Sequence, residues 1–254
     1  MRKTALTILA LAMAMPSAAK APARAPADVA AAVAAPGRPK DRVDLDEVRK
    51  PAEVLRFMGL KRGDRVLDYF AGTGYYSEIM ARAVGPKGLV LAWNSSSFQS
   101  DKVKQALDDI KSRNANFGYF TSPATAIAFP KDGFDFAMLH LVYHDTYWES
   151  AQYKVPRIDP NSVVQALWYT VKPGGTVAVV DHVATAGGDT REVVEKLHRI
   201  DPATVRADFE RAGFVLEAQS DILKVAEDHS KNVFDPGIRG RTDRFMFRFR
   251  KPAR

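Results

Sequence analysis

The chain has 254 residues, 46% hydrophobic and 26% charged, which is the composition of an ordinary globular protein with enough length for a substantial core. It contains no cysteine, which excludes disulfides, thiolate metal sites and a cysteine nucleophile. The formal net charge of +7 falls to +4 without residues 1–21, a basicity too modest to argue for nucleic acid as a partner.

The first residues have the pattern of a secretory signal peptide. Arg2 and Lys3 precede the apolar run TALTILALAMAM, which is too short to span a bilayer, and a stretch of small residues, 17–21, follows as an A-x-A-like cleavage site. We therefore expect residues 1–21 to be removed, with an uncleaved membrane anchor as the alternative. The mature protein is expected to be periplasmic or secreted, with no stable membrane insertion.

Residues 22–39, PARAPADVAAAVAAPGRP, are rich in alanine and proline. Four prolines within this stretch argue against a continuous helix, so it is expected to be a flexible linker. Residues 40–254 are then expected to form one domain.

From residue 40 onward, short β-rich runs alternate with longer stretches of helical period. A helix is predicted to begin at Pro51 and end at Gly59. Further helices are predicted over 75–83, 101–113 with Ser100 as its cap, 160–171, and from 202 to the stop at 213. Strands are predicted over 65–68, 89–93, 117–120, 134–139, 176–181, 214–219 and 244–250.

This alternation predicts an α/β fold: an open, doubly wound, mainly parallel, seven-stranded Rossmann-like sheet with helices on both faces. The last two strands have no helix between them, so the C-terminal strand is expected to be antiparallel and to lie at one edge. Its phenylalanines Phe245, Phe247 and Phe249 alternate with Met246 and with arginines, which predicts one core face and one face near solvent. Any ligand is expected at the carboxyl ends of the strands.

The stretch DYFAGTGYYS at 68–77 joins the first strand to a helix through a glycine-containing turn. Such a turn brings a ligand against bare backbone at a helix N-terminus, because a Cβ there would block the approach or forbid the φ angles. Ser77 occupies the third glycine position of a dinucleotide fingerprint, and no Gly-Lys-Ser/Thr follows, which argues against a nicotinamide, flavin or Walker phosphate site.

VLDYFAGTG at 66–74 resembles the first motif of class I S-adenosylmethionine-dependent methyltransferases. KPGG at 172–175, DPATVRADFERAGFVL at 201–216 and a terminal strand follow in the order of that family, so that the resemblance covers residues 50–252. More narrowly, HD at 144–145, DH at 181–182, LHRID at 197–201 and SKNVFDPGIRGRTDRF at 230–245 resemble exported bacterial proteins described as predicted methyltransferases.

The resemblance implies S-adenosylmethionine as the cofactor, lying over the glycines of the turn. The contacts that it implies come from Asp68, Phe70, Ala71, Gly72, Gly74, Asn94 and His140. Phe70 replaces the usual first glycine, and Asn94 stands where the family has a ribose-binding carboxylate. Ser122 and Pro123 stand where an Asp commonly meets the adenine amine.

The expected catalytic residues are His144, Asp145 and His182. His144 follows the fourth strand and can act as a general base, with Asp145 as an orienting carboxylate or as a partner to another group. Asp181 and His182 end the fifth strand, at the same edge of the sheet. With His140 these residues offer enough ligands for a divalent metal, but no compact metal-binding spacing is present, so no metal site is predicted.

Other side chains near this edge allow two interpretations. Tyr143, Tyr147 and Trp148 either pack a lid and the core or surround a planar substrate. His198 lies in a stretch rich in valine and leucine, and a structural role is expected for it.

The leading hypothesis is an exported methyltransferase acting on a small molecule. Because the cofactor is made in the cytoplasm and two of its usual contacts are replaced, the alternative is a methyltransferase fold that serves as a non-catalytic metabolite- or metal-binding protein. A metal-assisted hydrolase using His144 and His182 ranks last. The sequence does not indicate an oligomeric state.

Overall fold

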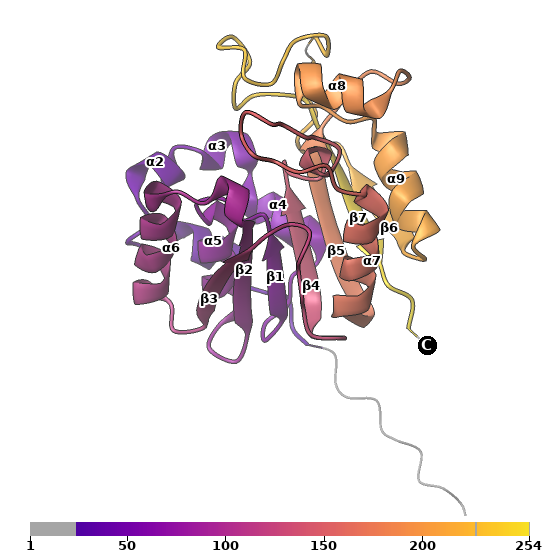
Figure 1. The fold of residues 1–254 in the computed structure, drawn as a ribbon. Coiled ribbons are helices and arrows are strands. Elements are labelled where there is room, and N and C mark those ends of the chain that lie inside the picture. Colours follow the sequence, from indigo (N-terminus) through magenta and orange to yellow (C-terminus); the bar gives the residue numbers. More distant parts are fainter. Residues whose placement is uncertain (1–23, 227, 254) are drawn as a thin grey trace, which may run out of the picture.

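The computed structural model describes residues 24–226 and 228–253, so the predicted signal peptide lies outside the described residues. A seven-stranded sheet in the order β3-β2-β1-β4-β5-β7-β6 forms its centre (Figure 1). The strands are β1 Arg65–Tyr69, β2 Leu89–Ser95, β3 Phe117–Ser122, β4 Phe134–His140, β5 Val171–His182, β6 Val215–Ser220 and β7 Arg244–Arg250. The predicted fold class is confirmed.

The antiparallel strand is β7, as predicted, but its predicted place at the edge of the sheet is wrong. It pairs antiparallel with β5 on one side and with β6 on the other, so β6 forms the edge. Both faces of β7 are covered in consequence: Phe249 and Met246 point to opposite faces and are fully buried, and Arg244 is only 3% exposed. The expected solvent-facing side of β7 is therefore absent over much of its length.

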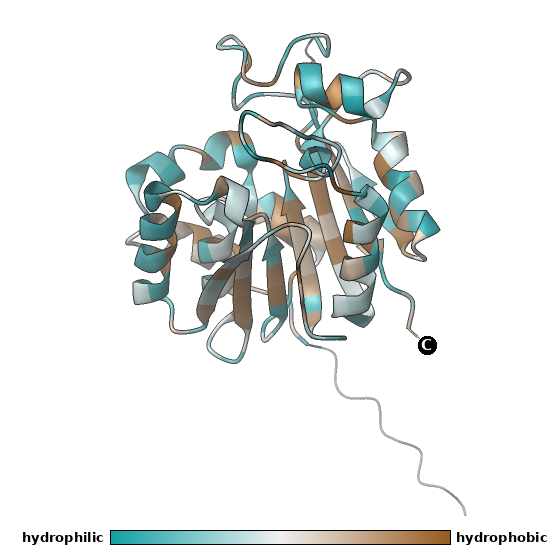
Figure 2. Cartoon of the chain, viewed as in Figure 1, coloured by the Kyte–Doolittle hydropathy of each residue, from teal (hydrophilic) through white to brown (hydrophobic). Residues whose placement is uncertain are grey.

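Helices cover both faces of the sheet. They are α1 Val29–Ala34, α2 Lys40–Val43, α3 Asp46–Arg49, α4 Pro51–Met58, α5 Tyr75–Val84, α6 Asp101–Arg113, α7 Pro160–Thr170, α8 Thr190–Leu197 and α9 Pro202–Arg211, with 3-10 turns η1 Ser96–Phe98 and η2 His144–Thr146. Apolar residues of α1, α4, α5 and α6 form one core cluster, and those of α7 and α9 form the other. Figure 2 shows apolar strands between helices with polar outer faces.

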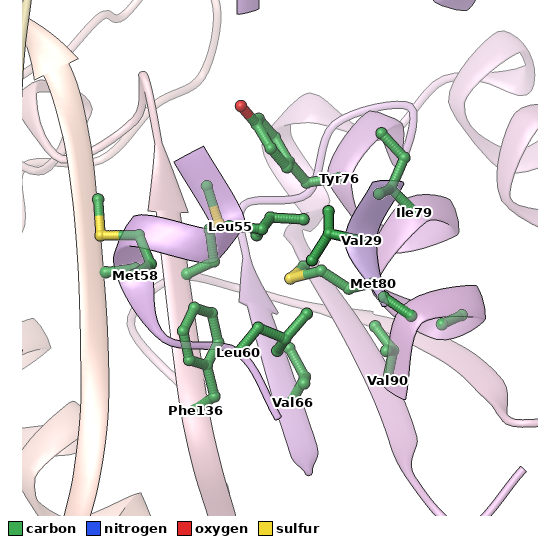
Figure 3. Packing of buried hydrophobic residues seen from close by; sticks show 14 of the residues in the cluster. Val29, Leu55, Met58, Leu60, Val66, Tyr76, Ile79, Met80, Val90 and Phe136 are labelled. Carbon is green, nitrogen blue, oxygen red and sulfur yellow. The ribbon is translucent and has the colours of Figure 1, made fainter. Parts of the chain in front are cut away.

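The prediction of a flexible linker over residues 22–39 is wrong for the described part of that stretch. Asp28 caps α1 by accepting a hydrogen bond from the N–H of Ala31, and Val29 and Ala32 of this helix are buried in the core cluster against α4 and α5. Figure 3 shows Val29 beside Ile79 and Met80 of α5. Proline placement misled the prediction, because Pro26 and Pro36 flank the short helix and do not interrupt it.

The carboxyl ends of β1, β2, β4 and β5 meet at one edge of the sheet, since these four strands are parallel and in register. Above this edge lie α8 and the long connections that precede and follow it (Figure 1). Within residues 24–226 and 228–253, no helix is both long and apolar enough to cross a membrane. In a sheet of this kind a ligand is expected at this edge.

Candidate functional site

The turn between β1 and α5 holds backbone conformations that favour glycine. Phe70, Gly72 and Gly74 all have positive φ, at 58°, 56° and 80°. A Cβ built on Gly72 meets no atom within 4 Å, so open space lies above this residue. A Cβ on Gly74 would come within 2.5 Å of Ile110 Cδ1, so Gly74 allows close packing on α6. Only Gly72 of the two glycines thus leaves its backbone open to a ligand.

Asn94 holds the turn in place. Its Oδ1 accepts a hydrogen bond from the N–H of Gly72 at 2.8 Å, and its Nδ2 donates to the carbonyl of Gly72 at 2.9 Å. The side chain is buried at the end of β2. The carboxamide of Asn94, which is predicted to meet the cofactor ribose, therefore holds the backbone of Gly72. A carboxylate at this position could not make both bonds because it has no donor.

Asp68 faces the interior of the turn. Its Oδ2 accepts a 2.5 Å hydrogen bond from the hydroxyl of Ser77 on α5, and the residue is 3% exposed. Burial raises the pKa of Asp68 to about 7, although the hydroxyl and the N–H of Ser77 lower it in part. The structure thus gives Asp68 a role in joining β1 to α5.

A cavity of about 630 Å³ opens at the carboxyl edge of the sheet, where the segments after β2, β4 and β5 meet. Aromatic rings form much of its wall, from Phe98, Trp148, Tyr153 and Phe234. Gly72 does not line it, but Phe70 of the same turn contacts Phe98 with ring centroids 5.7 Å apart. A planar, largely apolar molecule with a few polar groups would fit such a cavity.

Three histidines line this cavity: His144, His182 and His198. His144 is buried, and its Nδ1 lies 2.8 Å from Asp181 Oδ1. Its Nε2 lies 3.4 Å from Asp145 Oδ1. Burial lowers the pKa of His144, but the carboxylates of Asp181 and Asp145 outweigh this and raise it to about 9. Without a bound cation, His144 therefore carries a proton near pH 7.

His182 and His140 differ from His144 in charge. Burial lowers the pKa of both well below the usual histidine value, so both are neutral near pH 7. The Nδ1 of His182 lies 2.7 Å from the hydroxyl of Thr242. His140 packs on the ring of Tyr76, and its Nε2 is buried without a hydrogen-bond partner among the described residues. A bound ligand would satisfy such a nitrogen.

Both the sequence and the fold of this chain are similar to those of known methyltransferases. Residues 45–120, from the start of α3 to β3, match the family described as Protein-L-isoaspartate(D-aspartate) O-methyltransferase. Demethylmenaquinone methyltransferase of Listeria welshimeri is 26% identical over 130 residues, which are 51% of this chain and 49% of the relative. A SAM-dependent methyltransferase from Aquifex aeolicus superposes with a TM-score of 0.57 at 20% identity, covering 82% of this chain and 98% of that one.

The chain has the fold of S-adenosylmethionine-dependent methyltransferases, and its similarity in sequence to methyltransferases covers about half of its length. The same fold also serves a cyclase, SpnF, which superposes with a TM-score of 0.58 at 17% identity over 81% of this chain and 82% of the cyclase. This chain spans about half the length of the curated methyltransferases that it matches. A shared fold does not determine the reaction, so the geometry of the site decides which chemistry this chain can support.

Of the predicted catalytic residues, all three lie at the cavity. Two carboxylates orient His144, those of Asp145 and Asp181. The sequence does not reveal Asp181 as a partner, because 37 residues separate it from His144. The predicted role of His144 as a neutral base does not fit a pKa of about 9, since the proton is already in place at neutral pH. The neutral imidazole at the cavity is that of His182.

His198 is the residue that the sequence interpretation missed. It was expected to be structural, but its ring lines the cavity between Trp148 and Phe234, at centroid distances of 5.2 and 5.0 Å. It follows the last residue of α8 and ends that helix in the left-handed conformation, with φ 51°. The motif LHRID contained the only signal, and nothing in its spacing relates it to His144.

Proposed function

We propose that this protein is an exported methyltransferase that uses S-adenosylmethionine to methylate a small, planar, aromatic acceptor in the cavity at the carboxyl edge of the sheet. The observation that carries the proposal is the open backbone at Gly72, in a turn that the family uses for its cofactor, beside a cavity lined with aromatic rings. Export is supported by the charged and apolar pattern of residues 1–21.

The turn fits the proposed cofactor on two grounds. Space above Gly72 is open, and the buried Nε2 of His140 at the end of β4 has no hydrogen-bond partner among the described residues. Gly72, Ala71 and His140 would hold the cofactor, and Asn94 would fix the turn beneath it. When bound, S-adenosylmethionine supplies an activated methyl group, so that the protein has mainly to orient the acceptor and exclude water.

The walls of the cavity favour an aromatic acceptor. Phe98, Trp148 and Phe234 offer ring faces and edges on which a planar molecule can stack. The similarity to a demethylmenaquinone methyltransferase is consistent with a quinone-like acceptor, although it covers only half of that relative. We therefore infer a hydroxylated aromatic molecule as the acceptor class.

His182 is the proposed proton acceptor. A hydroxylated acceptor becomes a better nucleophile when it loses its proton, and the imidazole of His182 in the cavity can accept that proton if the negative charge formed on the acceptor offsets the burial that lowers its pKa. His144 has the opposite character, because Asp181 and Asp145 favour positive charge on it. It would orient an anionic oxygen and would not remove a proton.

The first test is calorimetric titration of the full chain with S-adenosylmethionine and S-adenosylhomocysteine. Gly72→Ala is expected to weaken binding at least about tenfold, a loss of about 1.4 kcal/mol, because its methyl group fills the open space above the turn. Gly63→Ala is the matched control: Gly63 has φ 77°, and its Cβ would also meet nothing within 4 Å. Gly63 precedes β1 at the opposite edge of the sheet, so its variant should bind like the wild type.

Binding alone does not separate an enzyme from a binding protein, so turnover is the second measurement. Release of S-adenosylhomocysteine would be followed with a panel of hydroquinones and naphthoquinols. Cofactor binding without turnover on any aromatic acceptor would favour the non-catalytic alternative. Absence of binding by the folded wild-type protein would exclude both proposals for the turn.

A further inference from the structure

Three side chains with metal-binding atoms converge at the cavity. The Nε2 of His144 lies 3.4 Å from Asp145 Oδ1, and the Nδ1 of His198 lies 3.9 Å from the same oxygen. One ligand atom from each of the three residues lies within 4.8 Å of the other two, and this is the one such group among the residues that the structure describes. The cluster joins η2, after β4, to the end of α8.

These separations are close to those of a metal site. Ligand atoms about 2.0–2.2 Å from a Zn²⁺ ion lie roughly 3.0–3.6 Å from one another in tetrahedral or octahedral arrangements. The 3.4 Å pair already meets this range, and the 3.9 Å pair exceeds it by a few tenths of an ångström. The ligand atoms of His144 and His198 lie within 4.8 Å of each other, so an ion bound by all three residues requires the His198 ring to move toward the other two ligands.

A buried carboxylate fixes the far side of the His144 ring. Its Nδ1 is bonded to Asp181, which leaves Nε2 to face Asp145 and the cavity. Asp181 is fully buried, and its two oxygens also accept hydrogen bonds from the N–H groups of His144 at 2.9 Å and His182 at 2.8 Å. A buried carboxylate that fixes the ring of a histidine ligand is the usual support of a metal-binding imidazole.

The electrostatics agree with this geometry. Asp181 and Asp145 place two carboxylates on opposite sides of one buried imidazole ring. This arrangement favours positive charge at the ring, and a metal ion at Nε2 supplies such charge. His198 packs between the rings of Trp148 and Phe234, which hold its imidazole at the cavity.

We propose that His144, Asp145 and His198 bind a divalent transition metal ion of the Zn²⁺ class, with an open coordination position toward the cavity. Two imidazole nitrogens and one carboxylate favour Zn²⁺, Co²⁺ or Fe²⁺ over Mg²⁺ and Ca²⁺, which prefer oxygen ligands. Three protein ligands leave at least one position for an exogenous ligand. The ligand suited to it is an anionic oxygen or a small anion.

The test measures metal binding on the full chain after treatment with a chelator and in the absence of any methyl donor. Zn²⁺ would be titrated in competition with a chromophoric chelator, and Mg²⁺ serves as the hard-cation comparison. We expect one tightly bound Zn²⁺ per chain and no detectable competition from Mg²⁺. His198→Asn removes the imidazole but retains a residue that tolerates positive φ, so the variant should fold.

His198→Asn is expected to weaken Zn²⁺ binding by more than 100-fold, beyond the roughly 10–100-fold effect of losing a supporting partner. Asp181→Asn should fall within that smaller range. His229→Gln is the matched control, because His229 also pairs with an aspartate, Asp243, but lies outside the cluster. Unchanged Zn²⁺ affinity in a folded His198→Asn variant, or no Zn²⁺ binding by the folded wild type, would overturn the proposal.

The open position has its own readout. The Co²⁺-loaded protein should show visible d–d absorption, and azide should shift that absorption by occupying the free position. An azide-insensitive spectrum would contradict the open position. Binding of S-adenosylhomocysteine, measured on the same sample, separates the two proposals. A protein that binds S-adenosylhomocysteine but no Zn²⁺ would support the proposed function and contradict the metal site.

Discussion

The buried carboxyl of Asp68 gives a pH dependence with a definite sign. Its pKa is about 7 in the folded protein, because of burial, against 3.8 ordinarily. Between about pH 4 and pH 7 the folded state therefore holds a proton that the unfolded chain releases, so the stability due to this group falls as pH rises through that window and levels off above it. Asp68→Asn, which has no charge to bury, is expected to gain roughly 2–4 kcal/mol relative to wild type between pH 4 and pH 8.

Urea unfolding of the wild type and of Asp68→Asn at pH 4.5 and pH 8.5 measures this difference. Ser77→Ala is a useful companion, since loss of the hydroxyl that bonds Asp68 should raise the pKa of Asp68 further and extend the loss of stability to higher pH. A difference in unfolding free energy between wild type and Asp68→Asn that stays constant with pH would show that Asp68 is ionised in the fold.

How far single site residues can be predicted depends on whether they follow a strand. His144, Asp145 and His182 lie directly after or at the end of parallel strands, and the register of a parallel sheet brings such positions together. His198 follows a helix in a long crossover, and its approach to Asp145 depends on how that crossover folds back. Asn94 is at a predicted position, but its bonds to Gly72 depend on a side-chain rotamer that no pattern specifies.

The two glycines of the turn between β1 and α5 differ in what surrounds them, because Gly72 faces open space and Gly74 packs on α6. Gly72→Ala adds a methyl group in open space, so its cost to stability is mainly that of positive φ, about 1 kcal/mol. Gly74→Ala adds the same strain and also drives a Cβ to 2.5 Å from Ile110 Cδ1 and 3.0 Å from Leu107 Cδ2. We expect Gly74→Ala to lower the free energy of unfolding by roughly 2–4 kcal/mol in total.

A double-mutant cycle identifies the cause. Ile110→Val removes the Cδ1 atom that the new methyl group would meet, so the double variant with Gly74→Ala should lose less stability than the two single variants added together. The free energies would come from urea unfolding at one pH. Strict additivity would mean that backbone strain at Gly74 accounts for the whole effect and that packing on α6 does not.

At the level of elements, the strands could be predicted because each is a short apolar run between turn signals, and β7 even has the predicted bounds. The order of the strands in the sheet could not be predicted in the same way. The lack of a helix between β6 and β7 indicates antiparallel pairing, but it does not indicate that β7 lies between β5 and β6. That choice depends on long-range packing, in which Phe249 stacks on Phe209 of α9 with ring planes 10° apart.

At the scale of the whole molecule, the N-terminal segment is part of the domain and closes one face of it. Arg82 of α5 donates hydrogen bonds to the carbonyls of Ala35 and Pro36 at 3.1 and 3.0 Å, directly after α1. The same arginine pairs with the fully buried Glu78, which also meets Arg42 and Arg113. A buried carboxylate with three arginines is costly to disrupt, so the packing of this segment is coupled to the core.

Two neighbouring alanines of α1 test this packing in the full chain. Ala32 is 4% exposed and faces the core, whereas Ala30 is exposed on the same helix. Ala32→Asp is expected to lower the free energy of unfolding by roughly 2 kcal/mol or more, because it buries a charge without a partner, and Ala30→Asp should change it by less than about 0.5 kcal/mol. Both substitutions introduce the same residue into the same helix, so helix propensity cancels in the comparison. Equal urea midpoints for the two variants would restore the flexible linker that the alanine- and proline-rich sequence suggests, whereas a lower midpoint for Ala32→Asp alone would establish α1 as part of the folded domain.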